Sequence, residues 1–150
     1  MKEFKKVLFP LDLSESSVKI VPYVRAVAEK FDSQIYLLFV ARVFDYFTGI
    51  YVPNPSITQF EKEIITGAEQ RLSEFTEEYF KDCPNTEATV VAGDASEEII
   101  RYIELNGIDL VVMGTHGRKG LDKVIFGSVA ERVIKSAPIP VLVVNPYKTT

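Results

Sequence analysis

Hydrophobic positions along this chain alternate between short continuous runs and longer segments with helical spacing. Continuous runs are typical of strands that are covered on both faces, as in a parallel sheet. Five such runs predict strands at 5–10, 34–40, 86–92, 109–113 and 140–144. Strands that alternate with helical segments favour right-handed β–α–β crossovers in one sheet.

Four segments between these strands have apolar residues three or four positions apart, which indicates one buried helical face. They cover residues 14–31, 57–81, 95–105 and 128–136. Asp94 and Glu97 have capping-box spacing, and Asn106-Gly107 is a typical helix end. Pro22 predicts a local irregularity in the first helix. The predicted apolar faces consist of Val18, Val21, Val24, Val27, Ala28 and Phe31; Phe60, Ile64, Ala68, Leu72, Phe75 and Tyr79; and Ile99, Ile100, Ile103 and Leu105.

The expected fold is therefore α/β: one domain over 1–150, a doubly wound, Rossmann-like, five-stranded parallel sheet with helices on both faces. A chain of 150 residues with 47% hydrophobic and 25% charged residues is ordinary for one globular domain. Residues 42–56 carry many aromatics without a period and are predicted as an irregular loop. This loop forms either a lid or partner surface, or a segment that packs its own aromatic rings.

Charge and cysteine content disfavour several kinds of binding site. The 17 basic and 21 acidic residues give a net charge of −4, which disfavours a nucleic-acid surface. The single cysteine, Cys83, excludes an internal disulfide, and one cysteine with one histidine is too few for an ordinary structural zinc site. The charged first residues and the absence of an apolar run of about 20 residues lead us to expect a cytoplasmic protein without a membrane partner.

Candidate chemistry gathers at the predicted carboxyl ends of the strands, where open parallel sheets bind ligands. The richest segment follows the fourth strand, with Gly114, Gly117 and, after nine residues, Gly127-Ser128 at a helix start. Glycines let the backbone approach a ligand closely, and the amides at a helix N-terminus favour phosphate. The two ends of this excursion are therefore predicted to hold a polyphosphate.

Several segments together resemble the universal stress protein family over essentially the whole chain. They are VLFPLDLSESS, YLLFV, GDASEEI, VVMGTHG with nine residues before GS, and IPVLVV. The spacing G-x2-G-x9-G-[ST] is that of the branch that binds ATP, so the resemblance implies an adenine nucleotide alpha hydrolase-like fold and ATP or AMP as ligand, with Mg²⁺ on the phosphates. The nucleotide-binding residues that it implies are Pro10, Leu11, Asp12, Val40, Met113, Gly114, His116, Gly117, Arg118, Gly127, Ser128 and Val129.

Three of these side chains have alternative roles. Asp12 is placed either to accept from the nucleotide or to serve as a turn or cap aspartate. Arg118 is either a counter-charge to phosphate or an ordinary solvated residue. His116 is the only histidine, yet no motif places a second acid–base group or a nucleophile with it, so we expect no catalytic residue.

The last apolar run is a candidate sheet edge, and an uncovered edge tends to pair with another chain. The family resemblance implies a homodimer through Val141, Leu142, Val143 and Val144.

The expected function is that of an ATP-binding regulatory or sensor dimer in stress response, with an unknown protein partner and at most weak ATPase activity. One alternative is a slow ATP hydrolase or another nucleotide-processing enzyme. Against it, the chain has no pyrophosphate-binding SGGxDS-type loop and no paired carboxylates placed for Mg²⁺. The other alternative is a dimeric scaffold without nucleotide, against which the intact glycine pattern argues.

Overall fold

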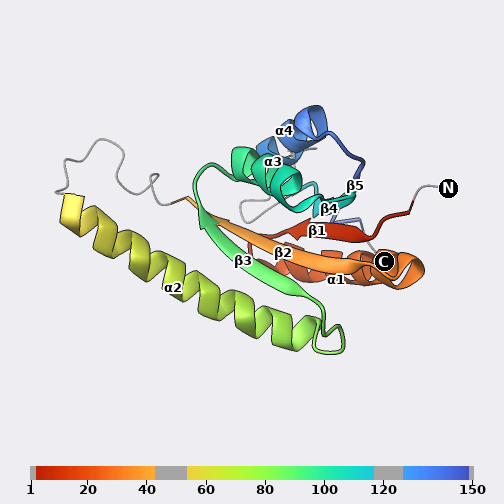
Figure 1. The fold of residues 1–150 in the computed structure, drawn as a ribbon, viewed down its shortest axis with the longest axis horizontal. Helices are drawn as coiled ribbons and strands as arrows, with labels where there is room; N and C mark the ends of the chain where they lie inside the picture. The colour runs from red at the N-terminus through yellow and green to blue at the C-terminus, as the bar shows by residue number, and fades with distance from the viewer. Residues whose placement is uncertain (1–2, 43–53, 117–126, 149–150) are drawn as a thin grey trace.

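A computed structural model describes residues 3–42, 54–116 and 127–148, with only the backbone described over 54–57. Strands and helices alternate along these residues (Figure 1). The elements are β1 (Lys6–Pro10), α1 (Glu15–Phe31), β2 (Gln34–Ala41), α2 (Asn54–Tyr79), β3 (Glu87–Ala92), α3 (Ala95–Asn106), β4 (Leu110–Gly114), α4 (Ser128–Ser136) and β5 (Val141–Val144).

All five strands form one parallel sheet in the order β3-β2-β1-β4-β5. The central strand β1 pairs with β2 from Lys6↔Gln34 onward and with β4 at Val7↔Leu110. The order therefore reverses between β1 and β4, and β3 and β5 form the edges. The predicted fold class and the edge position of the last strand are confirmed.

Side chains alternate between the two faces of the sheet, so each strand contributes to two cores. Val7 and Phe9 face α1 and α2, whereas Leu8 faces α3 and α4. Helices α1 and α2 cover one face of the sheet, and α3 and α4 cover the other (Figure 1).

Some local predictions differ from the structure. Helix α2 begins at Asn54, three residues before the predicted start. The predicted first helix is present as α1 and includes the exposed Pro22. Val18 is 37% exposed, while Ile20, absent from the predicted face, is buried. Leu105 is 77% exposed because it lies on the outer side of α3, away from the buried Ile99 and Ile103. Most of the predicted loop at 42–56 lies outside the described residues.

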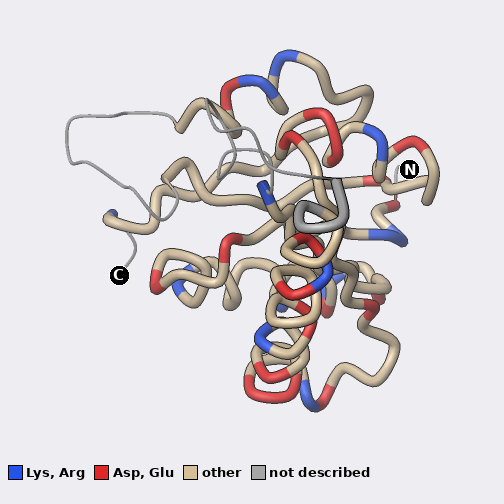
Figure 2. Tube along the Cα trace, turned by 90° about the vertical axis from the view of Figure 1, so that its left-hand side faces the viewer, with Lys and Arg blue, Asp and Glu red and all other residues tan. Residues whose placement is uncertain are grey.

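Basic and acidic residues are mixed along the part of the chain that the structure describes (Figure 2). Among the described helices, none combines the length and the apolar character that crossing a bilayer requires.

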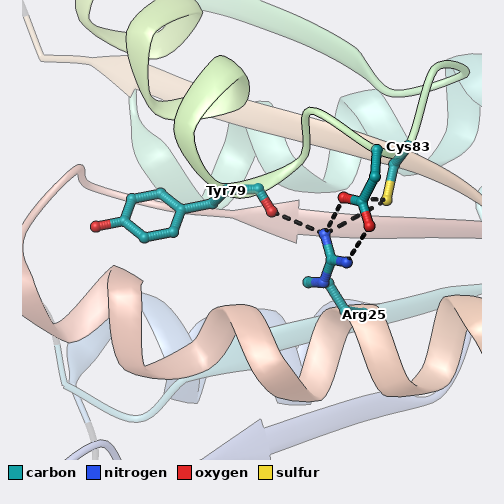
Figure 3. A network of polar contacts seen from close by, with 4 residues as sticks. Arg25, Tyr79 and Cys83 are labelled. Atoms are coloured by element: carbon teal, nitrogen blue, oxygen red, sulfur yellow. Dashed lines mark hydrogen bonds and ion pairs between the residues drawn. The ribbon is translucent and has the colours of Figure 1, made fainter.

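An arginine ties the two helices on one face together (Figure 3). Arg25 of α1 donates through Nη1 to Asp82 Oδ1 at 2.7 Å and through Nη2 to Asp82 Oδ2 at 2.6 Å. Its Nη1 also donates to the carbonyl oxygen of Tyr79, the last residue of α2, at 2.9 Å. The guanidinium thus satisfies a carbonyl at the negative end of the helix dipole. Cys83 lies beside it, and burial raises the pKa of its thiol, which favours the unreactive protonated form.

We predict that the titration of Asp82 depends on Arg25. Hydrogen bonds from Arg25 lower the pKa of Asp82 to about 2. An unfolded aspartate titrates near pH ~3.9, so this pair stabilises the fold above that pH and its contribution is lost as the pH falls towards 2. Arg25→Met should raise the Asp82 pKa towards its ordinary value, as measured by NMR of the side-chain carboxyl carbon.

The matched control is Arg101→Met, because Arg101 pairs with Glu98 on α3 and not with Asp82. This variant should leave the Asp82 midpoint where it is in the unmodified protein. An Asp82 midpoint that stays low in Arg25→Met would contradict the assignment.

Candidate functional site

The site is built where the strand order reverses, at the adjacent carboxyl ends of β1 and β4. The first end carries Pro10, Leu11 and Asp12, and the second carries Met113 to His116. Leu11 N donates to Leu38 O at 3.0 Å, which keeps the end of β1 in register with β2. Of the predicted nucleotide-binding residues, Pro10, Leu11, Met113 and His116 are buried; Asp12, Val40, Gly114, Gly127 and Val129 are half-buried; and Ser128 is exposed.

The turn after β1 is held by Asp12. Its Oδ1 accepts from Ser14 N at 3.0 Å, from Ser14 Oγ at 2.5 Å and from Ser17 Oγ at 2.9 Å. Between these residues Leu13 has a φ of 63°, a left-handed conformation that costs a bulky residue about 1–3 kcal/mol. Packing of Leu13 against the core and the three hydrogen bonds compensate this strain. Asp12 is therefore a turn aspartate, and its contact with a ligand stays a prediction.

The exit of β4 is held by Thr115. Its backbone N–H donates to Val144 O of β5 at 2.9 Å, and its carbonyl accepts from Gly127 N at 2.5 Å. These two bonds connect the exit of β4 to the edge strand and to the start of α4. The structure thus brings Gly127 next to Thr115, the residue that follows Gly114.

Both described glycines of the motif lie where a side chain would be crowded. A Cβ on Gly114 would lie 3.3 Å from His116 O, and one on Gly127 would lie 3.0 Å from Thr115 O. The predicted residues Gly117 and Arg118 lie outside the described residues. For Gly114 and Gly127, the need for glycine therefore arises from close backbone packing at this site.

The first turn of α4 faces the same edge. Gly127 is its N-cap, in extended conformation, and contributes no side chain that could cap the first amides. The exposed Ser128 is the first helical residue, and Val129 packs against the second core. Backbone amides at such a helix start, together with a serine hydroxyl, suit an anionic ligand.

His116 is buried beneath this edge, with 8% of its surface exposed. Its Nδ1 shares a hydrogen bond with Thr115 Oγ1 at 2.8 Å, which orients the ring. The His116 ring also makes a T-shaped contact with Tyr147, from the segment after β5. The histidine is thus a packed part of the exit of β4.

Asp94, at the carboxyl end of β3, has the capping role that the sequence predicts. Its carboxylate accepts from Glu97 N at 3.1 Å and from Ser96 Oγ at 2.8 Å. These bonds lower the pKa of Asp94, and the charges of Arg132 and Arg42 lower it further. Both arginines therefore add positive potential near the carboxyl edge.

No group of three His, Cys, Asp or Glu side chains in the described part of the chain is placed to hold a metal ion. A groove of about 450 Å³ lies between α2 and β3, and none of its lining residues belongs to the predicted site: Glu69, Leu72, Ser73, Thr76, Glu77, Ala88, Thr89 and Val90.

Sequence reasoning missed three residues that shape the site. Ser17 donates a hydrogen bond to Asp12, and Thr115 accepts one from Gly127. Tyr147 contacts the His116 ring. A polar residue on the apolar face of the first helix was an available signal for Ser17. The signal for Tyr147 was an Asn-Pro pair directly after the last strand.

We predict opposite effects of one substitution at two glycines. Gly127→Ala should lower the free energy of unfolding by about 1 kcal/mol, because the new methyl group crowds Thr115 O. Gly67→Ala should raise it by about 0.5–1 kcal/mol, because Gly67 lies within α2 and a Cβ there meets nothing within 4 Å. Urea denaturation measures both, and equal effects would contradict the close approach at Gly127.

Comparison with known proteins gives a consistent result. The universal stress protein family matches residues 3–145. Universal stress protein MJ0531 of Methanocaldococcus jannaschii is 35% identical over 147 residues, which are 97% of this chain and 84% of the relative. Universal stress protein MJ0577 of the same organism is 30% identical over 154 residues, 95% of each chain.

Solved structures show the same fold. Universal stress protein UspA from Lactobacillus plantarum superposes with a TM-score of 0.81 at 19% identity, over 97% of this chain and 100% of the other. The solved structure of MJ0577 superposes with a TM-score of 0.79 at 29% identity, over 96% and 97% of the two chains. With a family match over nearly its whole length and this sheet order, the chain belongs to the universal stress protein family.

Proposed function

We propose that this chain binds an adenine nucleotide, ATP in preference to AMP, at the carboxyl edge between β1 and β4, and that it acts as a nucleotide-dependent regulatory or sensor protein. The observation that carries the proposal is the hydrogen bond of 2.5 Å between Gly127 N and Thr115 O. It brings the start of α4 to the exit of β4, so that an anion-binding helix end lies beside the sheet's switch point.

The proposed roles follow from position. The amides at the start of α4 and the Ser128 hydroxyl bind phosphate, together with Gly117 and Arg118 of the glycine motif. Asp12 and Val40, together with the buried Pro10, Leu11 and Met113, form the adenine and ribose side. Mg²⁺ would be held on the phosphates of the nucleotide, as is usual for this ion.

Two structurally similar proteins support an adenine nucleotide in this fold. One solved universal stress protein is described as a complex with cAMP, with a TM-score of 0.60 at 19% identity. Another, from Archaeoglobus fulgidus, is described as a complex with dAMP, with a TM-score of 0.64 at 18% identity. We favour ATP over these monophosphates because the two ends of the glycine motif offer two places for phosphate.

A slow hydrolase is the alternative function, and the turnover rate distinguishes the two. A regulatory protein should bind ATP with little turnover. Steady release of ADP or AMP above ~1 s⁻¹, a typical lower value for enzymes, would favour the enzyme.

We predict saturable binding of about one ATP per chain when MgATP is titrated by calorimetry into nucleotide-free protein, as one carboxyl edge offers one site. Ser128→Asp should weaken this binding more than about tenfold, because a carboxylate would repel the phosphates. The helix itself should tolerate the change, since an acidic residue is favourable in a first turn.

The matched control is Ser136→Asp, which introduces the same charge at the other, exposed end of α4. It should bind ATP as the unmodified protein does. Folded protein that shows no ATP binding would refute the nucleotide proposal and favour the scaffold alternative.

We also propose that two copies pair through β5, which forms one edge of the sheet. Val141 and Val143 pack against the second core and Val144 against the first, whereas Leu142 is 40% exposed. Leu142 is therefore the residue of this strand that a partner copy would cover most.

We predict that Leu142→Glu yields monomers by light scattering, because two copies would bring like charges and desolvated carboxylates together. Leu105→Glu changes an equally apolar, exposed residue on α3 and should leave the mass unchanged. A dimer that persists in Leu142→Glu would place the interface elsewhere.

A further inference from the structure

The segment after β5 folds back towards the nucleotide site through a tight turn. Asn145 Oδ1 accepts from Tyr147 N at 2.9 Å, and Asn145 O accepts from Lys148 N at 3.1 Å. Asparagine at the first and proline at the second position favour such a turn, because the amide side chain bonds the backbone and the ring presets φ. The turn begins directly after Val144 and presents the Tyr147 ring to the carboxyl edge.

Tyr147 spans the gap between two elements of the site. Its ring lies edge-to-face on His116, with centroids 5.1 Å apart and an interplanar angle of 74°. Lys19 Nζ of α1 lies 5.6 Å from the Tyr147 centroid, within the range of a cation–π contact. Tyr147 is 44% exposed, whereas His116 is buried. The tyrosine therefore covers the histidine from the solvent side.

Backbone hydrogen bonds connect the same segments as this aromatic contact. Thr115 N donates to Val144 O, and Thr115 O accepts from Gly127 N. Thr115 Oγ1 in turn bonds the His116 ring. The exit of β4 is thus connected to the end of β5 through Thr115–Val144 and to the segment after it through His116–Tyr147, and it is connected to the start of α4 through Thr115–Gly127.

We propose that Tyr147 is a positioning residue for the nucleotide site, and that nucleotide binding in turn restrains the turn after β5. This inference rests on the proposed function. A ligand seated against the exit of β4 and the start of α4 stabilises the arrangement of Thr115 and His116 that Tyr147 also stabilises. Because coupling between two sites is reciprocal, each must strengthen the other. The same turn follows the edge strand β5, so occupancy would be communicated to the proposed dimer edge.

The test compares Tyr147→Ala with Tyr147→Phe. Phenylalanine keeps the edge-to-face contact with His116 and the ring face for Lys19, and it loses only the hydroxyl. By calorimetry with MgATP, Tyr147→Ala should bind about three- to tenfold more weakly, the range expected for an aromatic pair, whereas Tyr147→Phe should stay within about twofold of the unmodified protein.

Two NMR readouts separate positioning from general stability. The His116 ring protons should shift in nucleotide-free Tyr147→Ala, because the ring current of the tyrosine is lost, but little in Tyr147→Phe. In the unmodified protein, ATP should slow hydrogen exchange of the Tyr147 and Lys148 amides by about threefold or more, and this effect should disappear in Tyr147→Ala.

The outcomes are distinct. ATP binding by the unmodified protein with equal affinity in Tyr147→Ala would overturn this inference and leave the proposed function intact. Absence of ATP binding by the folded, unmodified protein would refute the proposed function and this inference with it. If Tyr147→Ala does not fold, Tyr147→Leu removes the aromatic contact with His116 and keeps apolar bulk, and it should bind ATP at least about threefold more weakly; an affinity within about twofold of the unmodified protein would overturn the inference.

Discussion

Burial of the central strand β1 on both faces is the constraint on which the remaining structure depends. Val7, Leu8 and Phe9 are at most 1% exposed, so β1 requires a paired strand on each side and a helix layer above and below. Its backbone groups are satisfied by β2 and β4, and its side chains by helices from both halves of the chain. The turn after β1 and the exit of β4, which form the candidate site, are both positioned by this strand.

The reversal of strand order beside β1 explains why polar groups gather at one edge. The chain leaves β1 towards one face and β4 towards the other, so neither crossover covers the gap between their carboxyl ends. At one side of the gap, Asp12 holds a strained turn with serine hydroxyls. At the other, Thr115 brings the start of α4 against the sheet. These contacts stabilise the fold, and the same geometry is the basis of the proposed anion site.

Long-range polar contacts decide how the outer elements are fastened to this frame. Arg25 reaches Asp82 and Tyr79 over more than fifty residues of sequence and ties α1 to the end of α2. At the carboxyl edge, Tyr147 connects the segment after β5 to His116 and Lys19. The proposed site and the proposed dimer edge share the strand β5 and the residues bonded to its end, which gives a physical route between them.

The sequence by itself determined the five strands, the four helices, the cap at Asp94 and the glycine pattern, because these depend on repeats and turn residues within a few positions of one another. The tertiary structure decided which strands are neighbours, that Leu105 faces solvent and that Ile20 replaces Val18 in the core. It also decided that Ser17 holds Asp12 and that Tyr147 covers His116. Such contacts depend on packing between segments distant in sequence, and hydrophobic periodicity carries no information about partners at that range.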